Sequence, residues 1–83
     1  MTILYFAWVR QKIGTGEECV SLPAHVMTIA QLIEYLRARG GGYADVFGDP
    51  DRLRAAVNQE YAPFETIIAD SDEIAFFPPV TGG

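Results

Sequence analysis

The chain begins with a run of apolar, aromatic and β-branched residues that ends at Arg10. This pattern predicts a central β-strand over residues 2–10, covered at least partly on both faces. Side chains alternate along a strand. One predicted face therefore holds Ile3, Tyr5, Ala7 and Val9, and the other holds Leu4, Phe6, Trp8 and Arg10. Arg10 indicates that the second face meets solvent or a partner. Trp8 fits exposure there and burial in the core equally well.

Residues 14–16 (Gly-Thr-Gly) predict a turn, and residues 17–22 predict a second strand that ends at Pro23. The two strands would form a hairpin. Cys19 lies in the second strand, and we expect it to be a small structural hydrophobe because no neighbouring group is placed to activate its thiol. His25 has no second histidine, cysteine or carboxylate at ligand spacing, so we expect a loop residue.

The strongest helix signal starts at Thr28. Thr28 and Gln31 have the spacing of a capping box, in which each side chain accepts a hydrogen bond from the other residue's backbone N–H. An apolar stripe follows at helical spacing: Ile29, Leu32, Ile33 and Leu36. Arginines near the end suit the helix dipole. The glycines at 40–42 are predicted to stop the helix and not to bind phosphate, because they follow a helix instead of preceding one.

The pattern after residue 42 is less informative. Residues 49–51 (Asp-Pro-Asp) fit either the start of a short helix or a turn. Residues 53–58 contain helix-favouring alanines, but a predicted turn at 58–60 favours a strand. Residues 70–73 (Asp-Ser-Asp-Glu) predict a solvated turn and no metal site, because no histidine or calcium-loop glycine accompanies them.

A final strand is predicted over residues 74–77, and a distinct tail follows it. Pro78 and Pro79 lack the N–H that a β-ladder needs, so the chain should leave the sheet extended. From Pro79 to Gly83 an extended backbone spans about 15 Å, at roughly 3.3 Å per residue. Such a tail could enter another protein's active site. A Gly-Gly end can also be frayed or a cloning remnant, but two prolines directly after a strand favour a presenting arm.

Composition narrows the functional classes. The 83 residues are 49% hydrophobic and 20% charged, as expected of one folded domain with a modest core. The net charge of −5 and the dispersed basic residues argue against nucleic acid and favour a basic protein partner. A single cysteine cannot form an internal disulfide, which suits the cytoplasm. The first apolar run is too short to span a membrane, so we expect no membrane association.

The predicted element order indicates an α+β protein of the β-grasp type, with a mixed sheet packed on one main helix. With the terminal Gly-Gly, the chain resembles the ubiquitin-like sulfur carriers and, more narrowly, the small subunits of molybdopterin synthase. The resemblance spans essentially the whole chain. It rests on Phe6-Ala7, Val9-Arg10, residues 55–59 (Ala-Ala-Val-Asn-Gln), Asp72-Glu73 and residues 75–83 (Ala-Phe-Phe-Pro-Pro-Val-Thr-Gly-Gly). Ser71 departs from the family, whose turn usually has glycine there.

The resemblance implies that the α-carboxylate of Gly83 is the reactive group. An E1-like adenylating enzyme would activate it with ATP, and a sulfur donor (a sulfurtransferase or desulfurase) would convert the acyl-adenylate to a thiocarboxylate. The tail, made of Pro79, Val80, Thr81, Gly82 and Gly83, would then enter the large subunit of a heterotetrameric molybdopterin synthase. There it would give sulfur to a cyclic pyranopterin precursor. The chain, residues 1–78 plus the tail 79–83, would be a non-catalytic sulfur-donating subunit without bound cofactor or metal.

Strand parity predicts the partner surface. Ile74 and Phe76 should face the helix, which places Ala75 and Phe77 on the opposite face beside Phe6. Exposed aromatics with an arginine beside them are typical of an interface core. The resemblance agrees with contacts at Phe6, Arg10, Asn58, Tyr61 and Phe77. In the alternative, Phe77 belongs to the core and only the tail binds.

Three other functions remain open at this point. A related carrier with the same tail chemistry could serve thiamine synthesis or tRNA thiolation. A ubiquitin-like modifier could be conjugated to lysines through the same carboxylate. A plain interaction domain would have an inert tail.

Overall fold

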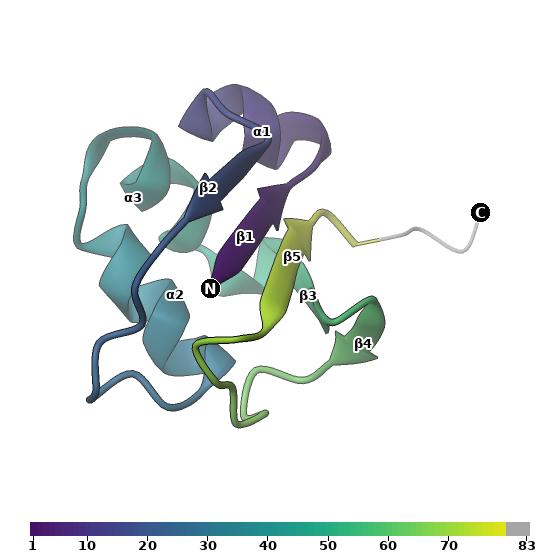
Figure 1. The fold of residues 1–83 in the computed structure, drawn as a ribbon. Helices are drawn as coiled ribbons and strands as arrows, with labels where there is room; N and C mark the ends of the chain where they lie inside the picture. Colours follow the sequence, from purple (N-terminus) through teal and green to yellow (C-terminus); the bar gives the residue numbers. More distant parts are fainter. Residues whose placement is uncertain (80–83) are drawn as a thin grey trace.

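The computed structural model describes residues 1–79 and shows a mixed five-stranded sheet in the order β2-β1-β5-β3-β4 (Figure 1). β1 and β5 are parallel, and the other neighbours are antiparallel. The strands are β1 (Thr2–Tyr5), β2 (Glu17–Cys19), β3 (Arg54–Val57), β4 (Glu60–Ala62) and β5 (Glu73–Phe77). The helices are α1 (Ala7–Ile13), α2 (Ile29–Arg37), α3 (Gly41–Phe47) and the 3-10 helix η1 (Pro50–Arg52). The predicted β-grasp arrangement is confirmed.

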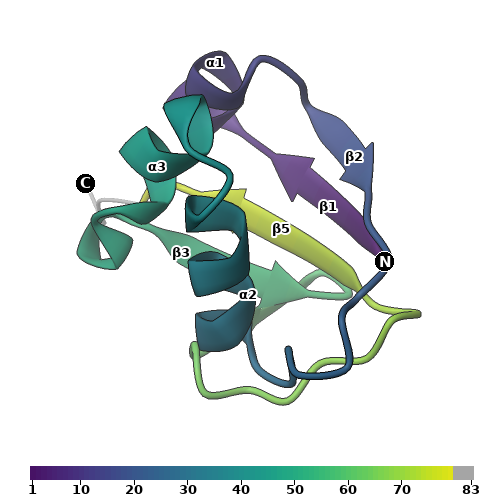
Figure 2. The same cartoon turned by 90° about the vertical axis from the view of Figure 1, so that its left-hand side faces the viewer.

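The core lies between the sheet and α2, which crosses in front of the strands in Figure 2. The capping box of Thr28 and Gln31 is present, and all four residues of the predicted stripe are buried. From the sheet, Ile74 and Phe76 are fully buried, as strand parity predicted. The ring of Phe76 meets that of Phe47 on α3 edge-on, with centroids 5.0 Å apart. The helix and the last strand therefore form the centre of the core.

The predicted strand over residues 2–10 is wrong beyond Tyr5. Phe6 takes the N-cap position, Ala7 has φ 54°, and α1 then buries Val9. The run lacked strict polar–apolar alternation, so its pattern also fitted a helix. Gly14, with φ 95°, ends α1 and donates its N–H to the Arg10 carbonyl at 2.8 Å. β1 and β2 are still antiparallel neighbours, but a helix and not a tight turn connects them.

Cys19 and the glycine triplet also differ from expectation. β2 is shorter than predicted and lies at a sheet edge, and Cys19 is exposed instead of packed as a hydrophobe. α2 ends before Gly40, but residues 41–42 begin α3 and do not only terminate α2. A Cβ at Gly42 would collide with the backbone carbonyl of Lys12, so glycine lets α3 approach α1. η1 resolves the ambiguous Asp-Pro-Asp segment as a short helix after Asp49.

The remaining sequence predictions for the middle of the chain hold. His25 lies in an exposed loop. Residues 54–57 form a strand, and Asn58 and Gln59 form the turn that follows, both with positive φ. Residues 70–71 form a turn before β5. Within residues 1–79, no helix has the length and apolar character needed to cross a membrane.

Glu18 on β2 joins four elements through polar contacts. Its carboxylate accepts hydrogen bonds from the hydroxyls of Tyr5 (2.6 Å) and Tyr43 (2.9 Å) and from the guanidinium of Arg39 (2.9 Å). Tyr5 is only 1% exposed, so its hydroxyl depends on Glu18 for a partner. The contacts tie β1, β2, α3 and the end of α2 together on the helix-covered side of the sheet.

We expect Glu18→Ala to lower the free energy of unfolding by about 1–3 kcal/mol, because it leaves the buried Tyr5 hydroxyl without an acceptor. Chemical denaturation of the purified chain would measure the change. The matched experiment is Glu18→Ala in a Tyr5→Phe background, where the buried Tyr5 hydroxyl is already absent and the loss should be smaller. Equal losses in the two backgrounds would contradict the role given to Glu18.

The same cluster should appear in acid unfolding. Burial raises the pKa of the Glu18 carboxyl, but the hydrogen bonds from Tyr5, Arg39 and Tyr43 outweigh it and hold the pKa below its usual 4.5. As the pH falls, the Glu18 carboxyl is therefore protonated at a higher pH in the unfolded chain than in the folded chain. The stabilisation is complete above about pH 4.5 and is lost as the pH falls through the lower folded-state pKa.

Glu18→Gln should accordingly flatten the decline of the melting temperature below pH 4.5 relative to the parent chain. Melting curves across that range, followed by circular dichroism, are the measurement. Glu65→Gln, at an exposed loop glutamate, is the matched control for the removal of one carboxylate. If Glu18→Gln left the slope of melting temperature against pH unchanged, the stabilising role of the ionised Glu18 carboxylate would be contradicted.

Candidate functional site

The candidate site is the end of the sheet at which β5 leaves it, here called the tail end. Phe77 is the last residue of β5 and pairs with Arg54 at the start of β3. On the other side, the carbonyl of Phe76 accepts a hydrogen bond from the N–H of Phe6 at 3.1 Å. Pro78 and Pro79 then follow outside any strand, as their missing N–H groups require. The tail therefore starts from a base that is fixed on both sides.

An aromatic group lies on the face of the sheet that the helices leave open. The rings of Tyr61 and Phe77 contact each other with centroids 5.6 Å apart. Together with Phe6, Leu4 and Ala75 they line a shallow hollow of about 460 Å³, here called the face hollow. Phe6 is 49% exposed and Tyr61 77% exposed, although both are large and apolar or aromatic. The structure thus brings three of the five predicted interface residues together.

The other two predicted interface residues lie outside this hollow. Arg10 is on α1 and not on a strand, and its guanidinium lies along Gly16 in the connection to β2. Asn58 is in the turn between β3 and β4. Its amide donates to the Asp72 carboxylate at 3.0 Å and accepts from the N–H of Glu73 at 3.0 Å. These bonds give Asn58 a structural task, the joining of the β3–β4 turn to the start of β5.

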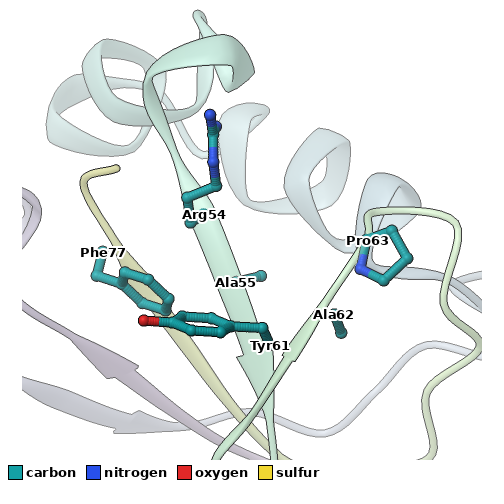
Figure 3. A pocket seen from close by; sticks show the side chains of 6 residues that line it. All are labelled: Arg54, Ala55, Tyr61, Ala62, Pro63 and Phe77. Carbon is teal, nitrogen blue, oxygen red and sulfur yellow. The ribbon is translucent and has the colours of Figure 1, made fainter. Parts of the chain in front are cut away.

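A second hollow, missed in the sequence, lies beside Phe77 on the side of β4. We call it the edge hollow, and Figure 3 shows the side chains around it. It measures about 480 Å³ and is lined by Arg54, Ala55, Tyr61, Ala62, Pro63 and Phe77. The Tyr61–Phe77 pair separates it from the face hollow. The sequence contained one signal for this hollow. Side chains alternate along the strand that includes Ala55 and Ala56, so strand parity would have placed Arg54 on the same face of the sheet as Phe77.

The described residues contain little catalytic chemistry. Residues 1–79 hold no group of three histidine, cysteine or acidic side chains able to bind a metal ion. Burial, and then the Glu18 carboxylate, raise the pKa of the Tyr5 hydroxyl well above its usual value, so this phenol stays protonated. Pro79 is the last residue described, and the predictions for Val80, Thr81, Gly82 and Gly83 lie outside the described residues.

Comparison with known proteins gives consistent matches. A model of the ThiS family matches residues 3–83. The molybdopterin synthase sulfur carrier subunit of Escherichia coli (strain K12) is 40% identical over 81 residues, which are 98% of this chain and 96% of that protein. A putative molybdopterin converting factor, subunit 1, from Pyrococcus furiosus has a TM-score of 0.75 at 31% identity and 95% coverage of each chain. Small archaeal modifier protein 1 of H. volcanii has a TM-score of 0.76 at 27% identity and covers 96% of this chain and 97% of that one.

These matches extend over the sheet, the helices and the glycine tail alike. They confirm the resemblance that the segments around α1, β3 and the last nine residues indicated, and they confirm the fold through solved structures with the same arrangement. The chain belongs to the ThiS family, and its relatives include the molybdopterin synthase sulfur carrier subunits.

Proposed function

We propose that this chain is a sulfur carrier of molybdenum cofactor biosynthesis, the small subunit of a molybdopterin synthase. The observation that carries the proposal is the full-length match to carriers of this kind, which includes the terminal Gly82-Gly83. The structure supports it with a central strand that ends at Phe77 and passes directly into two prolines beside an exposed aromatic surface.

The chemistry assigned to the tail follows from the reactivity of carboxylates. A carboxylate is a poor electrophile at neutral pH, so the Gly83 carboxylate must first attack ATP, releasing pyrophosphate and forming an acyl-adenylate. The outer sulfur of a donor persulfide then attacks the acyl carbon and displaces AMP, and a thiol cleaves the S–S bond of the resulting acyl disulfide. This leaves a thiocarboxylate, which is a good sulfur nucleophile, and a disulfide on the donor side. An E1-like adenylating enzyme would catalyse the first step, and the large subunit would accept the sulfur for the pyranopterin precursor. ATP use by these partners suits the cytoplasm as the compartment.

The recognition surface that we propose is the open sheet face. Phe6, Tyr61 and Phe77 supply aromatic area next to the tail, as interface cores commonly do. The tail is too short to present Gly83 to a buried active site unless the partner also covers this face, because its reach is only about 15 Å. Arg10 would contact the partner at the edge of the surface, and Asn58 would act by holding the turn beside it.

A second function has one specific observation in its favour. A structural neighbour is named small archaeal modifier protein 1 and matches this chain over 96% of its length. A modifier would use the same carboxylate but end in an isopeptide bond to a lysine of another protein. Mass spectrometry of the chain purified from its own cells separates the two. Exchange of one carboxyl oxygen for sulfur marks the carrier, and branched adducts on other proteins mark the modifier.

Deletion of Gly83 should abolish thiocarboxylate formation and molybdopterin synthesis. The new terminal carboxylate would be too short to reach the active site of the adenylating enzyme or that of the large subunit. Intact mass after incubation with ATP, the adenylating enzyme and a sulfur donor is the measurement. The full-length chain without ATP is the control and should stay unmodified. Cofactor synthesis that survives the deletion would overturn the carrier assignment.

Phe77→Ala should weaken binding to the large subunit by about 2 kcal/mol, roughly 30-fold in Kd, as expected of an aromatic anchor at an interface centre. Titration calorimetry would measure the loss. Ile67→Ala is the matched control, since Ile67 is another large exposed apolar residue but lies in the loop beside the start of α2. Equal affinities of the two variants would show that the tail binds without the sheet face.

A further inference from the structure

Arg54 is the charged side chain among the residues that line the edge hollow, and it lies at the base of the tail. Its backbone pairs with Phe77, so any partner that receives the tail must come close to it. The other lining residues offer mainly apolar or aromatic surface, and Figure 3 shows Arg54 above Ala55 and the Tyr61–Phe77 pair. The hollow therefore combines an apolar floor with one positive charge at its margin.

The positive charge of Arg54 is not neutralised within residues 1–79. Its Nη1 donates to the carbonyls of Leu53 (2.7 Å) and Asp51 (3.3 Å), and neither acceptor is a carboxylate. A guanidinium has five N–H donors, so the fork keeps capacity for a further acceptor. Three of the other four arginines are engaged elsewhere: Arg37 with Glu34, Arg39 with Glu18, and Arg52 over the ring of Trp8 at 4.8 Å.

The chain's charge is distributed unequally between the two ends of the sheet. The opposite end, where β5 begins, carries four carboxylates, Glu60, Asp70, Asp72 and Glu73, and the N-terminal ammonium, which lies 3.5 Å from Asp70. No lysine or arginine side chain belongs to this group. The tail end carries four basic residues, Arg10, Lys12, Arg52 and Arg54, against four acidic ones, Glu17, Asp45, Asp49 and Asp51. The remaining two arginines are paired with Glu34 and Glu18, so the tail end is balanced in its side-chain charges and the excess of carboxylates lies mainly at the far end.

We propose that the edge hollow receives a segment of the tail-accepting large subunit in which an apolar side chain stands next to a carboxylate. The apolar side chain would cover Tyr61, Ala62 and Pro63, and the carboxylate would bind the free donors of Arg54. Charge complementarity selects this occupant, and continuity with the face hollow across the Tyr61–Phe77 pair places it at the tail's base. The inference rests on the proposed function.

The unequal charge gives the contact a second role. The partner's carboxylate attracts Arg54 and repels the carboxylates at the far end, so it favours an approach with the tail end forward. Such steering acts on the association rate and weakens as salt screens the charges. The net charge alone predicted a basic partner. Because the excess of carboxylates lies at the end of the sheet where β5 begins, that prediction applies only to partner surfaces that contact this end.

The test compares Arg54→Glu with Arg37→Glu for association with the purified large subunit from the same organism. Both substitutions change the net charge equally, and Arg37 is an exposed residue of α2 that lines neither hollow. At low ionic strength Arg54→Glu should associate about tenfold more slowly than Arg37→Glu, and the difference should shrink at high ionic strength. Arg54→Gln removes the charge but keeps a polar side chain, so its association rate should be intermediate. It is the control for structural effects of losing the hydrogen bonds from Arg54 to the carbonyls of Asp51 and Leu53.

Melting temperatures of all three variants must match the parent chain to within a few degrees for the rates to be compared, and Arg54→Gln carries the comparison if Arg54→Glu unfolds. Equal association rates for the Arg54 and Arg37 variants at both ionic strengths, with sulfur delivery intact, would overturn the role of Arg54 and leave the carrier function standing. A parent chain that neither binds the large subunit nor delivers sulfur would overturn the proposed function itself.

Discussion

The alternation of side chains along β5 is the constraint on which the rest of the structure depends. Ile74 and Phe76 point into the core, held by the parallel register with Ile3 and Tyr5 of β1. A slip of one residue would exchange Phe76 and Phe77 between core and surface. Because β5 has hydrogen-bonded neighbours on both sides, such a slip would break two ladders at once. Core packing therefore fixes where the tail starts and which aromatic ring stands beside it.

Strong local signals made part of this arrangement predictable. α2 followed from a capping box and an apolar stripe, and the two faces of β5 followed from parity, which also placed Phe6 and Phe77 on one side. The strand over residues 2–10 failed because a nearly continuous apolar run has no period to separate helix from strand. The structure shows a short helix instead, α1, which begins after Phe6 at the N-cap and ends at Gly14 in the left-handed conformation.

The features that sequence reasoning missed depend on tertiary contacts. Glu18 meets Tyr5, Arg39 and Tyr43 only after the sheet and helices have assembled, and nothing in their spacing announces it. The exposure of Cys19 follows from β2 lying at the sheet edge, which a strand pattern does not reveal. Arg54 was predictable as a surface residue. Its place in the edge hollow was not predictable, because the hollow also needs Tyr61 on β4 and Pro63 in the loop after it.

A carrier whose reactive group is a main-chain carboxylate has to be recognised through everything except that group. Glycines can follow a narrow channel, but a chain segment that becomes ordered in such a channel loses conformational entropy. The fixed strand end and the two prolines limit that loss at the base, where Phe76 pairs with β1 and Phe77 pairs with β3. Recognition can then rest on the rigid surface around Phe77 while the tail supplies reach. The proposed division would explain why the aromatic rings of Phe6 and Phe77 and the guanidinium of Arg54 lie near the end of the sheet from which the chain departs.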